Sequence, residues 1–235
     1  MTVRTIFLDA GGVLVFPNWS RVSVTLAEHG IAADPQALAA ADHVAKHEMD
    51  VDSYVKTSTD DGRWSRYFDL VLKHAGVEIN KTTHKAIGQL REYHDVHNLW
   101  ESVPTHVLPA LDRLRSLGLR LVVVSNVNGT LALLFDRLGL TNRIDLLVDS
   151  HREGVEKPDP RLFQRALQRA GAEAHSTVHL GDIFHVDVVG ARAAGIRAVL
   201  LDAANLYGAH DCERVGSLTE FIDRLEAEQL INTAG

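Results

Sequence analysis

Carboxylates, a lysine and a hydroxyl follow short apolar segments of this 235-residue sequence. Asp9 follows "TIFL", Asp182 follows "VHLG", and Ser125 follows "LVVV". Lys157 stands a little beyond a further apolar segment, "IDLLV". Carboxylate oxygens suit a hard cation such as Mg²⁺, and lysine and hydroxyl groups donate hydrogen bonds to anions. Brought together, these residue types could bind a metal ion and an anionic substrate.

Five apolar segments rich in β-branched residues have the length and composition of buried parallel strands. Their ranges are 5–9, 119–125, 144–150, 176–182 and 196–202. Helical patterns lie between them, as in 159–171, which opens with Asp159 and Pro160 and closes on Gly171. This alternation predicts an α/β fold with a doubly wound, mostly parallel sheet. Because the carboxyl ends of parallel strands share one edge, the polar residues that follow them are expected in one crevice.

The region 17–100 has a different pattern from the rest of the chain. Segments such as "SRVSVTLAEHG" and "TTHKAIGQLREYHDVHN" have helical spacing, and no credible strand interrupts them. We therefore predict a helical domain over 17–100. It is inserted into a discontinuous sheet domain made of residues 1–16 and 101–235.

Composition and charge exclude several classes of partner. The formal net charge of −7 and the absence of a long Lys/Arg run argue against nucleic acid, whose binding depends on neutralising phosphates with cations. No run approaches the roughly 20 apolar residues of a membrane span, and "MTVRTIFLD" is too short for a signal-peptide core. Cys212 is the only cysteine, so no internal disulfide can form. We expect a cytoplasmic protein with no nucleic-acid or membrane partner, and the sequence leaves its oligomeric state open.

Four motifs of the chain resemble those of the haloacid dehalogenase superfamily, in the order found in that family. "DAGGVL" resembles the first motif, "VVVSN" the second, "GVEKPDPRLF" the third and "HLGDIFHVDVVGARAAGI" the fourth. The third and fourth are highly specific, and together the four span the predicted sheet domain. The helical insertion lies between the first and second motifs, where one branch of the family carries a helical cap. The resemblance implies a hydrolase with a Rossmann-like core and a cap domain.

The resemblance also implies a nucleophile and a metal site. Asp9 would attack phosphorus and form an aspartyl-phosphate, which splits one difficult substitution into two easier ones. Mg²⁺ would be held by Asp9 and Asp182, together with the main-chain carbonyl of Gly11. Asp187 would be a further ligand or a support for the ligands, although an aspartate at this place could also be a helix cap.

Three more residues have implied roles in phosphate binding. Lys157 would screen the carboxylates and the incoming phosphoryl oxygens. Ser125, with the main chain near Asn126, would donate hydrogen bonds to the phosphate. The implied substrate is a small phosphorylated metabolite. Its identity should depend on the cap and on the loop "VFPNWSR", where Phe16, Trp19 and Arg21 could line a pocket.

Gly11 departs from the pattern of the family's phosphatases, which have an aspartate two residues after the nucleophile. Glycine keeps the main-chain carbonyl that binds metal but deletes the carboxyl that protonates the leaving group and activates water. General acid–base help of this kind contributes roughly 10² to 10⁴ in rate. The leading interpretation is a Mg²⁺-dependent phosphatase whose substrates have good leaving groups, or whose acid comes from elsewhere. The histidines that could supply it are His29, His43, His47, His94 and His97 in the insertion and His185 in the fourth motif.

Other classes of function stay open. Haloacid dehalogenases need no acid for a halide, but they use no metal and generally lack the "GD" of the fourth motif. Phosphonoacetaldehyde hydrolase has a small residue at the position of Gly11 and keeps Mg²⁺, but it requires a cap lysine that forms a Schiff base. The insertion contains five lysines: Lys46, Lys56, Lys73, Lys81 and Lys85. A non-catalytic protein on this fold would instead sense a phosphorylated ligand.

Overall fold

The computed structural model describes residues 2–51 and 60–233, and the chain divides into two compact units. Unit 1 consists of Met1–Val15 and Val103–Gly235, and unit 2 consists of Phe16–Ser102. None of the helices within the described ranges is long and apolar enough to cross a membrane.

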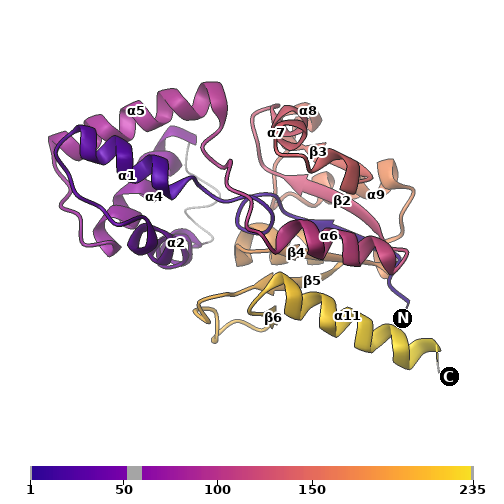
Figure 1. Ribbon diagram of the computed structural model, residues 1–235. Coiled ribbons are helices and arrows are strands. Elements are labelled where there is room, and N and C mark those ends of the chain that lie inside the picture. The colour runs from indigo at the N-terminus through magenta and orange to yellow at the C-terminus, as the bar shows by residue number, and fades with distance from the viewer. Residues whose placement is uncertain (1, 52–59, 234–235) are drawn as a thin grey trace. The chain divides into compact units, whose positions relative to one another are not determined.

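Unit 1 contains a six-stranded sheet in which every pairing is parallel. Its strands lie in the order β3-β2-β1-β4-β5-β6 (Figure 1). They are β1 (Thr5–Leu8), β2 (Arg120–Ser125), β3 (Leu146–Asp149), β4 (Thr177–Gly181), β5 (Arg197–Leu201) and β6 (Glu213–Val215). The predicted α/β fold with a doubly wound parallel sheet is therefore confirmed. The strand order reverses between β1 and β4, and open α/β sheets bind ligands outside the carboxyl ends of their strands at such a switch point.

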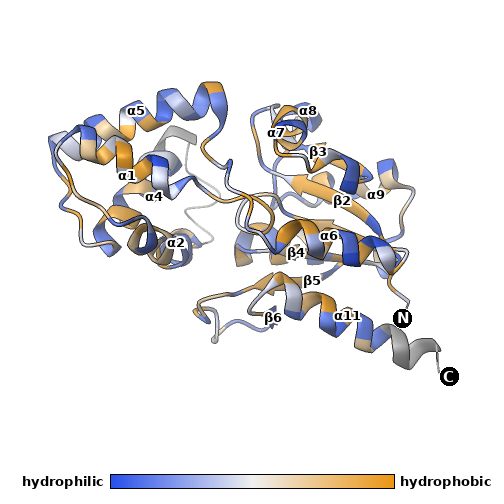
Figure 2. Cartoon of the chain, in the orientation of Figure 1, coloured by the Kyte–Doolittle hydropathy of each residue, from blue (hydrophilic) through white to orange (hydrophobic). Residues whose placement is uncertain are grey.

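The central strands of unit 1 are buried because helices cover the sheet. All four residues of β1 are buried, and so are the last five of β2. One core joins Phe7 and Val122 to Phe163. Figure 2 shows β2 in the hydrophobic colour, whereas α6 and α11 carry both hydrophobic and hydrophilic residues. The helices are α6 (Val107–Ser116), α7 (Leu131–Arg137), α8 (Ser150–Glu153), α9 (Pro160–Ala170), α10 (Val189–Ala193) and α11 (Leu218–Thr233), with short turns η1 (Thr141–Arg143), η2 (Ala174–Ser176) and η3 (Phe184–Val188).

Each predicted strand is shorter in the structure by one to three residues, and two differences have a clear local cause. The strand expected over 144–150 ends at Asp149, because Ser150 already begins α8. The Asp149 carboxylate accepts hydrogen bonds from the main-chain N–H of His151 and Arg152, as a helix N-cap does. The edge strand β6 was not predicted, since it is only three residues long and two of them, Glu213 and Arg214, are charged.

Unit 2 is built from helices, as predicted for the insertion. They are α1 (Trp19–Glu28), α2 (Pro35–Met49), α4 (Asp60–His74) and α5 (Lys81–His97). Local signals start them: the side chain of Asn18 caps α1, Asp34 caps α2 just before Pro35, and Asn80 caps α5. The described part of unit 2 contains no strand, only an isolated antiparallel bridge between Phe16 and Ser102. The helices enclose their own apolar core, which includes Leu26, Phe68 and Leu90.

Candidate active site

The site begins where β1 ends. Asp9 follows the last residue of β1, and its main-chain N–H donates to the carbonyl of Leu180 in β4. Asp9 is a buried residue, at 8% exposure. Its Oδ1 accepts a hydrogen bond of 2.7 Å from the N–H of Ala10 and lies 2.9 Å from Nζ of Lys157. Asp9 is thus held at the carboxyl edge of the sheet by its neighbours on both sides.

Lys157 is a buried cation that lies between two carboxylates. Its Nζ lies 2.9 Å from Oδ1 of Asp9 and 2.7 Å from Oδ1 of Asp187. Asn126 fixes the main chain of Lys157: its Oδ1 accepts from the Lys157 N–H at 2.8 Å, and its Nδ2 donates to the Lys157 carbonyl at 2.9 Å. Both ends of the Asn126 amide are therefore used to position Lys157. Only the main chain of Asn126 is left for the predicted contact with phosphate.

Asp187 is fully buried and accepts hydrogen bonds on both carboxylate oxygens. Lys157 Nζ and His179 Nε2 lie 2.7 Å and 2.9 Å from Oδ1, and the N–H of Ile183 donates to Oδ2 at 3.1 Å. Space for this carboxylate comes from Gly181. A Cβ atom on Gly181 would lie 2.1 Å from Cγ of Asp187. The carboxylate of Asp187 therefore occupies the space that a side chain at Gly181 would need.

Electrostatics fix the charges of this buried pair. Burial alone would lower the pKa of Lys157, but the carboxylates of Asp187 and Asp9 raise it above its usual value. Burial alone would raise the pKa of Asp187, but the adjacent ammonium of Lys157, followed by His179, lowers it well below its usual range. At neutral pH Lys157 is an ammonium and Asp187 a carboxylate.

Three carboxylates come close enough to share one cation. Asp9, Asp182 and Asp187 each offer an oxygen, and these oxygens all lie within 4.8 Å of one another. Oxygen donors of this kind are the preferred ligands of Mg²⁺. The donor set therefore fits Mg²⁺.

Ser125 and Gly11 lie at the same edge of the sheet. Ser125 is the last residue of β2, next to β1, and it is almost fully buried. Gly11 lies in the turn after β1, where the carbonyl of Ala10 accepts hydrogen bonds from the N–H of Leu14 and Val15, both at 2.9 Å. Gly11 has no side chain, so it offers no group for proton transfer two positions after Asp9.

Two residues of this region had no assigned role from the sequence. His179 lies inside β4 and contacts Asp187, and the signal for it in the sequence is a histidine between the apolar residues Val178 and Leu180. Ser150 fixes the loop after Asn126: its Oγ accepts from the N–H of Val127 at 3.1 Å and donates to the Val127 carbonyl at 3.2 Å. Neither contact follows from spacing, because each joins segments that are distant along the chain or separated by a turn.

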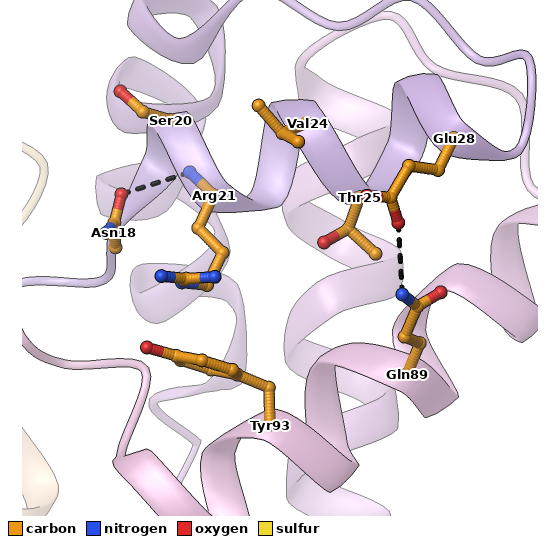
Figure 3. Close-up of a pocket in the computed structure, with 8 residues that line it drawn as sticks. All are labelled: Asn18, Ser20, Arg21, Val24, Thr25, Glu28, Gln89 and Tyr93. Atoms are coloured by element: carbon orange, nitrogen blue, oxygen red, sulfur yellow. Dashed lines mark hydrogen bonds between the residues drawn. The ribbon is translucent and has the colours of Figure 1, made fainter.

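Unit 2 has a polar pocket of its own, between α1 and α5. The guanidinium of Arg21 lies 3.9 Å from the centre of the Tyr93 ring, and its Nε donates to Oε1 of Glu101 at 3.2 Å. Figure 3 shows Arg21 over the ring and Glu28 hydrogen-bonded to Gln89. The pocket has a volume of about 330 Å³. Its lining residues are Asn18, Ser20, Arg21, Val24, Thr25, Glu28, Gln89 and Tyr93.

The three loop residues expected near a pocket have different environments. Arg21 lines the unit 2 pocket. Trp19 packs against the apolar core of unit 2, and Phe16 pairs through its main chain with Ser102. Of the three, only Arg21 offers a polar side chain to a pocket within its own unit.

Comparisons with known proteins agree on one family. The model of the haloacid dehalogenase-like hydrolases matches residues 3–195. Haloacid dehalogenase-like hydrolase domain-containing protein 3 of Homo sapiens is 32% identical over 178 residues, which are 74% of this chain and 70% of that protein. The glyceraldehyde 3-phosphate phosphatase of Methanothermobacter thermautotrophicus is 33% identical over 144 residues, which are 60% of this chain and 62% of that enzyme.

A solved structure shares the fold. The HAD-hydrolase YfnB of Bacillus subtilis bound to magnesium aligns with a TM-score of 0.68 at 16% identity, over 96% of this chain and 99% of that one. The sequence match extends over only 49% of the length of the Mus musculus and Danio rerio relatives. A family model that covers most of the chain, the match to the human relative and the parallel sheet with its helical insertion lead to one conclusion: the chain belongs to the haloacid dehalogenase-like hydrolases.

Proposed function

We propose that this hydrolase is a Mg²⁺-dependent phosphatase of small phosphorylated metabolites that acts through an aspartyl-phosphate on Asp9. The observation that carries the proposal is the buried Lys157 ammonium between Asp9 and Asp187, next to a cluster of carboxylates that suits a divalent cation. Relatives named as phosphatases of glyceraldehyde 3-phosphate and ribulose 1,5-bisphosphate support a phosphate ester as the substrate.

The nucleophilic atom can be assigned within Asp9. Oδ1 is occupied by the N–H of Ala10 and Nζ of Lys157, and the described residues provide no hydrogen bond to Oδ2. Oδ2 is therefore the oxygen that attacks phosphorus. In this step a bond from Asp9 to phosphorus forms, the bond from phosphorus to the leaving oxygen breaks, and the leaving group departs with the electron pair.

The remaining residues stabilise the charge that this step creates. Asp9, Asp182 and Asp187, with the carbonyl of Gly11, would hold Mg²⁺, which supplies positive charge at the phosphoryl oxygens. Lys157 keeps its proton and faces the carboxylate that reacts. In the second step, water would attack phosphorus as the bond from phosphorus to Asp9 breaks, with its electron pair returning to the Asp9 carboxylate. The proton that the water loses would pass to the surrounding solvent, and inorganic phosphate would leave.

Proton transfer to the leaving group limits the choice of substrate. Gly11 cannot protonate a departing alkoxide, so acyl and enol phosphates, whose leaving groups need little protonation, are the favoured substrates. A second acid in the chain would widen this range to sugar phosphates. The leaving group is therefore the variable that an assay should change first.

The lysines of the insertion weaken the phosphonate alternative. A Schiff base forms only from a neutral amine. Nζ of Lys46 forms an ion pair with Asp42, 3.1 Å from its Oδ2. Lys73, Lys81 and Lys85 are exposed, and Lys56 lies outside the described residues.

The test is phosphate release by the purified protein with Mg²⁺ or with a chelator. The substrates are an acyl phosphate, an aryl phosphate, glyceraldehyde 3-phosphate, phosphonoacetaldehyde and a 2-haloacid. We expect metal-dependent phosphate release that Asp9→Asn abolishes and that Asp136→Asn, at an exposed position of α7, leaves unchanged. Halide release without metal, or phosphate release that persists in Asp9→Asn, would contradict the proposal.

A further inference from the structure

His179 is a fully buried histidine beneath the carboxylate cluster, and the proposed reaction gives it no role. It is the third residue of β4, and its neighbours in that strand, Val178 and Leu180, are buried and apolar. The edge of its ring packs on Phe163 of α9, with 4.9 Å between ring centres and an interplanar angle of 76°. A buried imidazole costs free energy here, because its nitrogens lose their hydrogen bonds to water.

One nitrogen of His179 is paired and the other is not. Nε2 lies 2.9 Å from Oδ1 of Asp187, whereas Nδ1 is buried without a hydrogen-bond partner in the described structure. A carboxylate can only accept hydrogen bonds, so Nε2 must carry the hydrogen. With the hydrogen on Nε2, Nδ1 is left as an acceptor that has no partner in the described structure. The one hydrogen bond of the ring in the described structure is therefore the one that Nε2 donates to Asp187.

The donated hydrogen bond has consequences for Lys157. Oδ1 of Asp187 accepts from His179 and Lys157 together, and Oδ2 accepts from the N–H of Ile183. These three donors fix the plane and the position of the carboxylate. The position of Asp187 in turn determines where Nζ of Lys157 stands relative to Oδ1 of Asp9, 2.9 Å away.

We propose that His179 is a positioning residue: its Nε2–H holds the Asp187 carboxylate in the orientation that places the Lys157 ammonium against Asp9. This inference rests on the proposed function, because it assigns a step in the phosphatase reaction to the position of Lys157. Without the donor, Asp187 keeps its contact with Lys157 but can rotate about its side-chain torsions. Lys157 then follows it away from Asp9.

Two substitutions at His179 separate the effect of its hydrogen bond to Asp187 from the effect of its ring contact with Phe163. His179→Phe keeps a ring against Phe163 but removes the donor, and His179→Gln places an N–H near the position of Nε2. We expect kcat to fall roughly tenfold to a hundredfold in His179→Phe, since small misplacements of reacting groups cost rates of this order. KM should change by less than about twofold, because the loss falls on the transition state and not on binding. His179→Gln should recover most of kcat.

Packing alone is tested by Phe163→Leu, which removes the ring contact but leaves the hydrogen bond between His179 and Asp187. This variant should melt at a lower temperature and keep the kcat of the wild type at temperatures where it is folded. A kcat in His179→Phe equal to that of the wild type, or an equal loss of kcat in His179→Phe and His179→Gln when both are folded, would overturn the proposal.

A readout without catalysis distinguishes failure of this inference from failure of the phosphatase assignment. Nitrogen-15 NMR of the imidazoles in the metal-free protein should show the His179 ring with hydrogen on Nε2, and His179→Phe identifies its signals. A hydrogen on Nδ1 alone would overturn the inference even in an active phosphatase. Absence of phosphate release in the wild type, with the expected ring state, would overturn the proposed function and with it the step assigned to His179.

Discussion

At the scale of single residues, the candidate site joins a buried lysine to two carboxylates and has a glycine two positions after Asp9. Asp9, Lys157 and Asp187 form a buried chain of contacts at 2.9 Å and 2.7 Å. Gly11 lies two positions after Asp9, in a turn closed by hydrogen bonds to the carbonyl of Ala10. In the proposed phosphatase, Asp9, Lys157 and Asp187 would serve binding and charge, whereas Gly11 has no side chain that could transfer a proton.

Restoring a carboxyl at Gly11 should widen the range of substrates. We expect Gly11→Asp to increase kcat for an alkyl phosphate by up to about 10²-fold, because a general acid of this kind contributes roughly 10² to 10⁴. Hydrolysis of an acyl phosphate, whose leaving group needs little protonation, should change little. Gly11→Asn is the matched control, since it has the same shape without the acid. Equal kcat values for the two variants on the alkyl phosphate would show that Gly11 does not limit proton transfer.

The residue scale also shows what the sequence could not reveal. The motifs place Asn126 beside Ser125 at the end of a strand, but they do not say which neighbour its amide contacts. That amide closes two hydrogen bonds onto the main chain of Lys157, from a segment about 30 residues away along the chain. His179 was missed for the same reason, because its partner Asp187 is brought to it by the turn after β4.

At the scale of elements, the fold was largely predictable because the strands are buried and the helices have clear ends. Asp159 and Gly171 bound α9 as its N-cap and left-handed C-cap, where the sequence placed them. Short or charged elements were harder to recognise. β6 has three residues and gains its stability from pairing with β5, not from its own composition.

The junction between β4 and η3 depends on the absence of a side chain at Gly181. A Cβ atom there would lie 2.1 Å from Cγ of Asp187, so Gly181→Ala must displace the carboxylate or the strand. We expect it to lower the free energy of unfolding by about 1–3 kcal/mol, as overpacking does, and to reduce kcat. Urea denaturation monitored by circular dichroism measures the first effect.

The control for Gly181→Ala is Gly88→Ala in α5. A Cβ atom at Gly88 meets no atom within 4 Å, so this change should raise the free energy of unfolding by about 0.5–1 kcal/mol. Destabilisation of equal size at both positions would mean that the crowding at Asp187 is not the cause.

An arginine joins the carboxyl-terminal helix to the edge of the sheet. Arg197 in β5 donates to both oxygens of Glu228 in α11, at 2.6 Å and 2.7 Å, and to Glu213 in β6. The hydrogen bond from Arg197 lowers the pKa of Glu228 below its usual value. A carboxyl whose pKa is lower in the folded state stabilises the fold above its unfolded pKa, and this contribution is lost as the pH falls through the folded value.

Because the pKa of Glu228 is lower in the folded state, Glu228→Gln should change how the free energy of unfolding depends on pH. The wild type should lose stability as the pH falls from the unfolded pKa of the Glu228 carboxyl towards its lower folded pKa. The variant should lose less over the same range, because it has no carboxyl to protonate at this position. The difference should be of the order of 1 kcal/mol or less, since the pair is partly exposed. Denaturation curves at several pH values measure it, with Glu92→Gln on the exposed side of α5 as control. Parallel pH profiles for the wild type and Glu228→Gln would refute the contribution of Glu228.

At the scale of the whole molecule, two apolar cores of the described residues have no member in common. The core around Phe7 and Phe163 belongs to unit 1, and the core around Phe68 and Leu90 belongs to unit 2. The chain contains three tryptophans, at positions 19, 64 and 100, and all of them lie in unit 2. Tryptophan fluorescence therefore reports on the helical unit, whereas the three clustered carboxylates lie in the sheet unit.

Binding of Mg²⁺ should therefore stabilise one unit and leave the other unchanged. A ligand that binds only the folded state adds about 2.7 kcal/mol at a concentration 100 times its Kd. We expect Mg²⁺ to raise the melting temperature of one calorimetric transition, that of unit 1, without moving the transition followed by tryptophan fluorescence. Asp182→Asn should reduce this shift, because it removes one of the three carboxylates that offer ligand oxygens. An equal rise in both transitions would mean that the two units unfold as one. No rise in either would mean that the carboxylate cluster does not bind the ion.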